Sequence, residues 1–329
     1  MTLRILLWHV HGSWTTAFVQ GDHEYVVPVT PGRDSDGLGR AATWDWPDSV
    51  VELPPERLRD TDVDVVLLQR PHELELAERW TGRRPGRDVP AFYVEHNTPG
   101  GEVPYTRHPL ADQDEIPVVH VTHFNRLFWD CGSARTEVVE HGVVDPGHLY
   151  SGDWARAAVV VNDPVRRGRA VGADLLGELA RAAALDVFGM KVHALRDVLN
   201  LPGERLWTFE DLPQAQLHRE MARRRVYLHT ARWTSLGLSL IEAMHLGMPV
   251  VALATTEAVA AVPPEAGVVS TRTEELAAAV WRFVHDPSEA QAVGAAARAA
   301  ALERYGLGRF LADWDGLLTE AAVPRLRAG

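Results

Sequence analysis

The sequence predicts an α/β fold with parallel sheets, and its apolar pattern supports this in two ways. Short, nearly continuous apolar runs recur along the chain without the alternation of a half-exposed strand, which is typical of parallel strands buried between two helix layers. Between them lie stretches of helical periodicity, such as Leu276, Val280, Phe283 and Val284. The expected strands are Ile5–Trp8, Val63–Leu68, Ala91–Val94, Val118–Val121, Val138–Val139, Val159–Val161, Asp186–Phe188, Val226–Leu228, Val250–Leu253 and Val268–Val269.

The last part of the chain carries further helix signals. Thr271 and Glu274 have the spacing of a capping box, which would start a helix there. Gly306 follows an Ala-rich helix, and an amphipathic stretch covers Phe310–Leu318.

Two domains are expected from the length of 329 residues. Residues 1–150 hold 10 of the 15 histidines and several loops rich in Pro and Gly, whereas the second half is Ala-rich and more regularly helical. Turn residues at Asp145–His148 separate two expected strands, as a linker would. We therefore place a first domain at 1–150 and a second from 151 onward.

The charge and the single cysteine exclude several classes of protein. Lys+Arg 33 and Asp+Glu 45 give a formal net charge of −12, so no broad basic surface for nucleic acid or an anionic membrane is expected, and any anion site must be local. Cys131 alone allows no disulfide framework and no cysteine zinc motif. Neither a signal peptide nor an apolar run of about 18 residues occurs. A soluble, cytoplasmic protein is expected.

The segment 226–253 has the pattern of a strand, a loop with glycine, a helix and a further strand. In an open parallel sheet, ligands bind at the carboxyl ends of strands, where free N–H groups of a helix favour phosphate or sugar oxygens. Gly237 would let the backbone approach such a ligand. Glu242 lies on an otherwise apolar helix, and its carboxylate could accept hydrogen bonds from two ribose hydroxyls. The alternative is a solvated glutamate on an exposed helix face.

This segment resembles the carboxyl-terminal signature of retaining GT-B glycosyltransferases of the family 4 type. The resemblance rests on Gly237-Leu238, Glu242-Ala243-Met244 and Gly247-Met248-Pro249-Val250-Val251. Thr234 stands where the family has its first Glu, a donor-sugar contact in relatives, and its hydroxyl could give one hydrogen bond instead. The resemblance implies two Rossmann-like domains whose parallel sheets face a central cleft.

A second segment resembles the donor loop of the same family. Val159–Val161 and the residues up to 176 are similar to the first strand and donor loop of its second domain, where relatives place an Arg and a Lys on the donor diphosphate. Val171 occupies the Lys position, so the charge would come from Arg166, Arg167 or Arg169, since guanidinium groups bind phosphate through two hydrogen bonds. For any one of these arginines, a solvated basic turn is the alternative.

The first half offers polar residues after its expected strands. Gly12 lies in a turn that leads into a helix, which could face the diphosphate as the first loop does in relatives. His96 resembles the family's strand-end His that contacts the donor, and His123 follows the next strand. Loop histidines held by hydrogen bonds are the alternative. GT-B relatives need no metal, so His9 and His11 are not expected to form a metal site.

The strand and turn that close the first domain of the family are similar to Val138–Asp145, with His141 where Asn is usual. The family's last helix crosses back to the first domain. We therefore expect a donor domain at 151–305 and a crossing helix within 306–329.

The resemblance implies a hexosyltransferase that moves a sugar from a nucleotide diphosphate sugar to an acceptor hydroxyl with retention of configuration. No cofactor or metal is expected, because arginines and helix N–H groups can stabilise the departing diphosphate. The alternatives are a sugar-nucleotide-binding protein without turnover and a GT-B sugar-nucleotide epimerase or hydrolase. The expected partners are the donor and an acceptor, and a lipid acceptor would bring the protein to a membrane surface.

The candidate site residues fall into three groups. We expect His96, Arg166 and Arg169 to act in catalysis. The expected donor-binding residues are Gly12, Arg167, Thr234, Ser235, Leu236, Gly237, Leu238 and Glu242. Candidates for the acceptor side are Trp14, His123 and Trp233, although tryptophans more often pack in a core.

Overall fold

The structure, a computed structural model, describes residues 1–326 and divides into two units. One unit joins Met1–Val144 to the segment that begins at Leu307, and the other is Asp145–Gly306. Residues 145–150, which the sequence placed in the first domain, belong to the second unit. No helix in the described part of the chain is long and apolar enough to cross a membrane.

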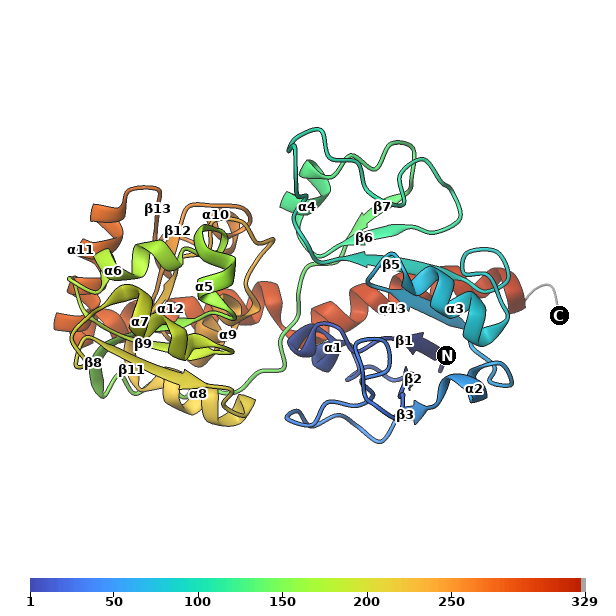
Figure 1. The fold of residues 1–329 in the computed structure, drawn as a ribbon, viewed down its shortest axis with the longest axis horizontal. Coiled ribbons are helices and arrows are strands. Elements are labelled where there is room, and N and C mark those ends of the chain that lie inside the picture. The colour runs from blue at the N-terminus through green and yellow to red at the C-terminus, as the bar shows by residue number, and fades with distance from the viewer. Residues whose placement is uncertain (327–329) are drawn as a thin grey trace. The chain divides into compact units, whose positions relative to one another are not determined.

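The amino-terminal unit is built on a parallel sheet that has seven strands within the described residues, in the order β3-β2-β1-β4-β5-β6-β7 (Figure 1). Its strands are β1 (Arg4–Leu7), β2 (Glu24–Pro28), β3 (Val50–Leu53), β4 (Val65–Leu68), β5 (Ala91–Glu95), β6 (Val118–His120) and β7 (Thr136–Val138). Its helices are α1 (Gly12–Phe18), α2 (Pro55–Leu58), α3 (Glu73–Thr81), α4 (His123–Phe128) and α13 (Leu307–Leu326). Helix α13, red in Figure 1, packs on α1 and β4.

The carboxyl-terminal unit has a parallel sheet with six strands among the residues described, in the order β10-β9-β8-β11-β12-β13. Its strands are β8 (Trp154–Val160), β9 (Ala184–Gly189), β10 (Leu206–Glu210), β11 (Arg224–His229), β12 (Val250–Leu253) and β13 (Gly267–Ser270). Its helices are α5 (Pro164–Arg167), α6 (Leu176–Leu179), α7 (Leu195–Leu199), α8 (Gln214–Ala222), α9 (Leu238–Leu246), α10 (Ala258–Ala261), α11 (Thr273–His285) and α12 (Pro287–Tyr305), with 3-10 turns η1 (Gly168–Val171), η2 (Ala173–Leu175) and η3 (Val192–Ala194).

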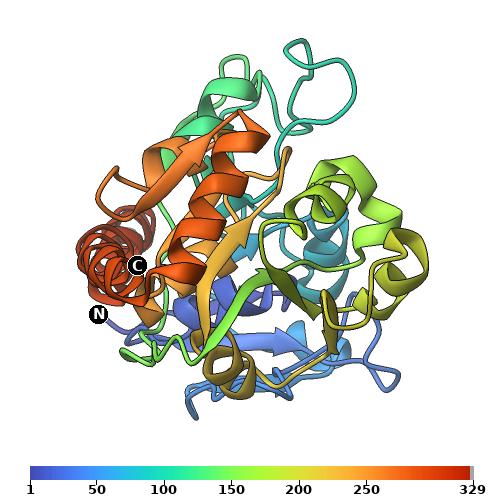
Figure 2. The same ribbon diagram turned by 90° about the vertical axis from the view of Figure 1, so that its left-hand side faces the viewer.

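Helices pack against the sheet of this unit in two groups. Helix α11, orange in Figure 2, contacts α6 and strands β8, β11, β12 and β13, whereas α9 packs with α8 and α12. The apolar side chains of α11 that the sequence singled out, Leu276, Val280, Phe283 and Val284, are all buried. The prediction of parallel strands between helices is confirmed.

Three strands, β2, β3 and β10, are absent from the predicted set. Strands β3 and β10 lie at sheet edges, and β10 alternates a buried Leu206 with a half-exposed Trp207. Such an edge strand lacks the continuous apolar run of a central strand. In β2, an apolar run of three residues lies between Glu24 and Pro28.

The predicted capping box at Thr271 and Glu274 is wrong. Helix α11 begins at Thr273, and its N-cap residue, Arg272, makes no side-chain capping bond. Ser270 makes the side-chain hydrogen bonds at the start of this helix. Its hydroxyl accepts a hydrogen bond from the Arg272 N–H at 3.0 Å and donates one to Glu275 at 2.6 Å. The helix start is therefore fixed from the end of β13.

Candidate functional site

The sheet of the carboxyl-terminal unit reverses its strand order between β8 and β11. From β8 the chain proceeds through β9 to β10 on one side, and from β11 through β12 to β13 on the other. In open parallel sheets, a ligand crevice lies at the carboxyl ends of the strands at such a point. The loops that follow β8 and β11 therefore form the candidate donor site.

These two loops are tied to each other by hydrogen bonds. The N–H of Trp233 donates to the carbonyl of Ala170 at 3.0 Å, and the Thr230 hydroxyl donates to the carbonyl of Val171 at 2.9 Å. Gly172, the next residue after Val171, has a φ of +72°. A Cβ atom at this position would lie 2.0 Å from the Thr230 carbonyl oxygen, so the close approach of the two loops requires glycine. The two predicted parts of the donor site are thus brought together.

The three arginines of the loop after β8 differ in their partners. Arg166 forms an ion pair with Asp163, and Arg169 forms one with Asp174 at 3.0 Å. The guanidinium of Arg167 has no hydrogen bond or ion pair to any described residue. Partial burial, and the charge of Arg166 beside it, lower the pKa of Arg167. Of the three guanidinium groups, that of Arg167 therefore has the least compensated charge. A bound anion would supply the hydrogen-bond partner that this side chain lacks.

The loop after β11 leads into the amino end of α9. Ser235 and Leu236 are buried, Thr234 and Leu238 are half-buried, and Trp233 is 36% exposed. The buried side chains of Ser235 and Leu236 anchor the loop and are not available to a ligand. A ligand would instead meet the backbone N–H groups at the amino end of α9. Gly237 is the N-cap of α9, and a Cβ atom there would come within 2.6 Å of the His229 ring.

Glu242 is buried in the second turn of α9. Its side chain is 5% exposed, and its Oε2 atom lies 3.4 Å from Nε2 of His218 on α8. Gln214, one turn before His218, contacts the same ring nitrogen at 2.8 Å. The alternative of a solvated glutamate is therefore wrong, because the carboxylate faces a histidine inside the unit.

In the amino-terminal unit, three histidines gather where the sheet reverses its order between β1 and β4. His11 precedes α1, His96 follows β5 and His141 follows β7. The ring centroids of His11 and His96 lie 3.9 Å apart. Burial lowers the pKa of His11 to about 4 and that of His141 to about 3, and it lowers the pKa of His96 well below the usual value. Nε2 of His96 and both ring nitrogens of His141 are buried without a protein hydrogen bond. These imidazoles are neutral at pH 7.

Of the further candidates in this unit, Trp14 has surroundings different from those expected. Trp14 is completely buried, and its ring packs on Phe18, His96 and Trp314, so it is a core residue and cannot stack on a sugar. His123 is exposed at the first position of α4. Gly12 is the first residue of α1, as expected, with the Trp44 ring nearby.

Sequence reasoning missed His218, His11 and Lys191. The contact of His218 with Glu242 joins two helices and has no signature along the chain. His11 was considered only as half of a His-x-His metal motif. Lys191, which follows β9, forms an ion pair with Asp163 at 3.5 Å, and its only signal was that it is the one lysine in the sequence.

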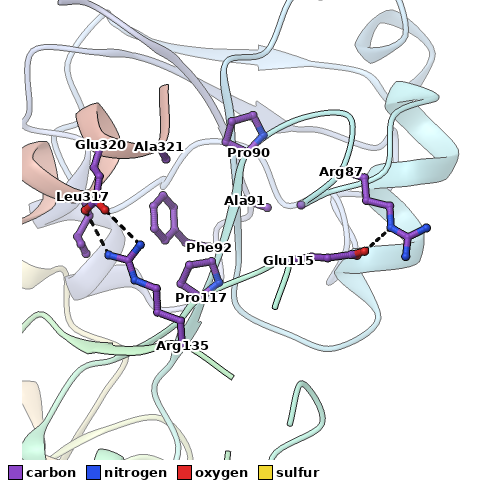
Figure 3. A pocket seen from close by; sticks show the side chains of 11 residues that line it. Arg87, Pro90, Ala91, Phe92, Glu115, Pro117, Arg135, Leu317, Glu320 and Ala321 are labelled. Carbon is purple, nitrogen blue, oxygen red and sulfur yellow. Dashed lines mark hydrogen bonds and ion pairs between the residues drawn. The ribbon is translucent and has the colours of Figure 1, made fainter. Parts of the chain in front are cut away.

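A cavity of about 420 Å³ lies elsewhere in the amino-terminal unit, at the amino end of β5 and beside α13 (Figure 3). Arg135 pairs with Glu320 at 3.2 Å across it, and Arg87 pairs with Glu115. Its position is opposite to the carboxyl ends of the strands, and its charges are already paired. Among residues 1–326, no three His, Cys, Asp or Glu side chains are grouped so that they could hold a metal ion.

The two parallel-sheet units define a GT-B glycosyltransferase fold, and solved structures of this class match the chain over almost its whole length. Sucrose-phosphate synthase from Thermosynechococcus elongatus matches with a TM-score of 0.72 at 14% identity, covering 97% of this chain and 98% of that chain. HepE from Anabaena in complex with UDP-glucose matches with a TM-score of 0.69 at 14% identity, covering 97% and 100%. A glycosyltransferase from Rickettsia africae gives 0.67 at 14% identity, covering 97% and 98%.

Residues 191–300 match the family described as glycosyl transferases group 1. The matched region contains β10 to β13 and the loop that leads into α9. No curated protein matches the chain. The family match supports sugar transfer, and the neighbours support the GT-B fold.

Proposed function

We propose that this protein is a retaining glycosyltransferase that transfers a hexosyl group from a nucleotide diphosphate sugar to an acceptor hydroxyl. The observation that carries the proposal is the pairing of two features in loops that are hydrogen-bonded to each other: Arg167, the least compensated arginine of the loop after β8, and the amino end of α9 after β11, which has no side-chain cap. A cation and free N–H groups together suit a diphosphate. HepE structures hold UDP and UDP-glucose, so UDP-glucose is the first donor to test.

The chemistry of this site favours stabilisation of a leaving group. The bond from the anomeric carbon to the diphosphate oxygen breaks, and the charge that develops on the diphosphate meets Arg167 and the N–H groups of α9. The acceptor oxygen bonds to the anomeric carbon, and its proton passes to the departing diphosphate oxygen on the same face of the sugar. Retention of configuration follows, and no carboxylate nucleophile is needed.

Incubation with a panel of nucleotide diphosphate sugars, with and without acceptor alcohols and sugars, tests the proposal. A transferase forms a new glycoside only when an acceptor is present, and NMR of its anomeric proton reports retention or inversion. Free sugar formed equally fast without an acceptor would indicate a hydrolase instead, and an altered sugar on the intact nucleotide would indicate an epimerase.

Catalysis is expected to need no divalent metal. The leaving-group charge is to be met by guanidinium and helix N–H groups, which act at neutral pH without a metal. Transfer rates measured after EDTA treatment, and again after addition of Mg²⁺ or Mn²⁺, should agree within about twofold. Loss of transfer with EDTA and its recovery with metal would contradict this expectation and the leaving-group mechanism with it.

A sugar-nucleotide-binding protein without turnover is the second candidate. Two observations favour it: Thr234 supplies no carboxylate where the family has its first Glu, and the Val171 side chain, at the family's Lys position, is buried in the core. This candidate predicts a rise in melting temperature with the donor but neither transfer nor donor hydrolysis. A ligand at 100 times its dissociation constant should stabilise the fold by about 2.7 kcal/mol.

A further inference from the structure

Lys191 lies beside Arg166 of the donor loop although it follows a different strand. It follows β9, and its ammonium group lies 3.5 Å from Oδ2 of Asp163, which follows β8. Arg166 contacts the same carboxylate oxygen. We propose that Lys191 is a further ligand of the donor diphosphate, an inference that rests on the proposed function of this crevice.

The backbone around Lys191 is firmly held, whereas its side chain is mostly exposed. Its φ is +56°, and that of Asp163 is +50°, a left-handed conformation that residues with a Cβ atom rarely adopt. The N–H of Met190 donates to the Asn162 side chain at 2.9 Å, and the N–H of Asp163 donates to the Met190 carbonyl at 2.8 Å. The Lys191 side chain is nevertheless 72% exposed. Its ammonium can therefore turn to a ligand without any change in the loops.

The charges at these strand ends leave room for an anion. Arg166, Arg167 and Lys191 supply three cations, and the carboxylates that contact Lys191 are that of Asp163, at its ammonium, and that of Glu210, at its backbone N–H. Glu210 accepts hydrogen bonds from the backbone N–H groups of Lys191 and His193. Asp163 alone then serves both Arg166 and Lys191. A diphosphate oxygen could take over as partner of the ammonium, leaving the carboxylate to Arg166.

The composition of the chain supports a special role for this position. Lys191 is the one lysine among 33 basic residues, so arginine serves everywhere else. An ammonium is a compact point charge with three donors, whereas a guanidinium is a broad plane. Beside Arg166 and Arg167, the compact group fits a shared anion more easily. It would also supply the cation that the buried Val171 cannot.

The single lysine makes a direct test possible. Lys191 is the one lysine of this sequence that an acetylating reagent can modify, and the amino terminus of the expressed chain serves as an internal control. Saturating UDP, GDP, ADP or inorganic pyrophosphate, whichever raises the melting temperature, should slow acetylation of Lys191 about tenfold or more. Acetylation of the amino terminus should not change. Mass spectrometry of the two peptides reads both rates in one sample.

Two substitutions complete the test. Lys191→Met should weaken binding of the same diphosphate about 10- to 100-fold, the range for losing a hydrogen bond to a charged group. Lys191→Arg should recover only part of the affinity, because the broader guanidinium keeps the charge but fits the shared anion less easily. Binding of the nucleoside without phosphate should be equal in all three proteins. If the diphosphate raises the melting temperature but neither protects Lys191 nor loses affinity in Lys191→Met, the proposal is overturned and the donor site stands. If no diphosphate binds the wild type, both fail.

Discussion

At the scale of single residues, the three arginines of the donor loop have unequal roles because their partners differ. Arg167→Ala should weaken nucleoside diphosphate binding most, by about 1.5–3 kcal/mol. Arg169→Ala should cost less, since Arg169 already pairs with Asp174 and its side chain is 78% exposed. Calorimetric titration of the three single variants and the triple variant gives the comparison. Unchanged affinity in all four would remove the arginines from the site.

Glu242 allows a second test at the same scale. If its buried carboxylate binds the ribose, Glu242→Gln weakens nucleotide binding, and a 2′-deoxyribonucleotide donor binds the wild type less well. The two losses should then be less than additive, because both remove one contact. Glu303→Gln, on the exposed face of α12, is the matched control and should bind like the wild type. Fully additive losses would show that Glu242 and the 2′-hydroxyl do not meet.

At the scale of elements, the junction of η1 and η2 depends on one glycine. Gly172→Ala would place a Cβ atom 2.0 Å from the Thr230 carbonyl oxygen at a φ of +72°. The loops after β8 and β11 would have to separate, and we expect a loss of about 1–3 kcal/mol in the free energy of unfolding. Gly177→Ala is the control, because its Cβ would make only an ordinary contact with Leu199 at 3.8 Å. Urea denaturation of the two variants compares them, and equal stability would contradict the close packing.

The helices and strands also show which parts of the fold can be predicted from the sequence. Central strands such as β4, β8 and β12 were predictable, because burial on both faces requires continuous apolar runs. The end of α9 at Gly247, whose φ is +86°, was predictable for a similar local reason. Edge strand β10 depends on its pairing with β9, which is distant in sequence. The start of α11 depends on Ser270, whose hydrogen bonds to Arg272 and Glu275 do not have the spacing of a capping box. The same holds for the site: its loops could be found from pattern, but the contacts of Glu242 with His218 and of Lys191 with Asp163 come from tertiary packing.

At the scale of the whole molecule, each unit has its own buried core. In the amino-terminal unit, one cluster joins Leu6, Val66 and Val118 from three strands, and in the other unit a cluster joins Val159, Leu228 and Val280. The two cores also enclose buried, neutral histidines, whose rings take up protons more readily once the chain unfolds. The stability of both units is therefore linked to pH.

The buried histidines predict that the protein loses stability in mild acid. Burial lowers the pKa of His141 to about 3, that of His120 to about 3 and that of His229 to about 4, whereas an unfolded histidine has a pKa near 6.5. Between these values the unfolded chain binds more protons than the native protein, so the free energy of unfolding falls as the pH falls. Each such histidine should cost about 2 kcal/mol between pH 7 and pH 5.

His141→Asn isolates one of these contributions. Urea denaturation at pH 7 and pH 5 should show a smaller difference between the two pH values in this variant, by about 2 kcal/mol, because asparagine cannot take up a proton in the unfolded chain. His123→Asn is the matched control, since the His123 side chain is exposed on α4 and remains in water in both states. It should keep the pH dependence of the wild type. A pH dependence in His141→Asn as steep as that of the wild type would mean that this ring is protonated inside the folded unit, against the burial and the missing hydrogen-bond partners that the structure shows for it.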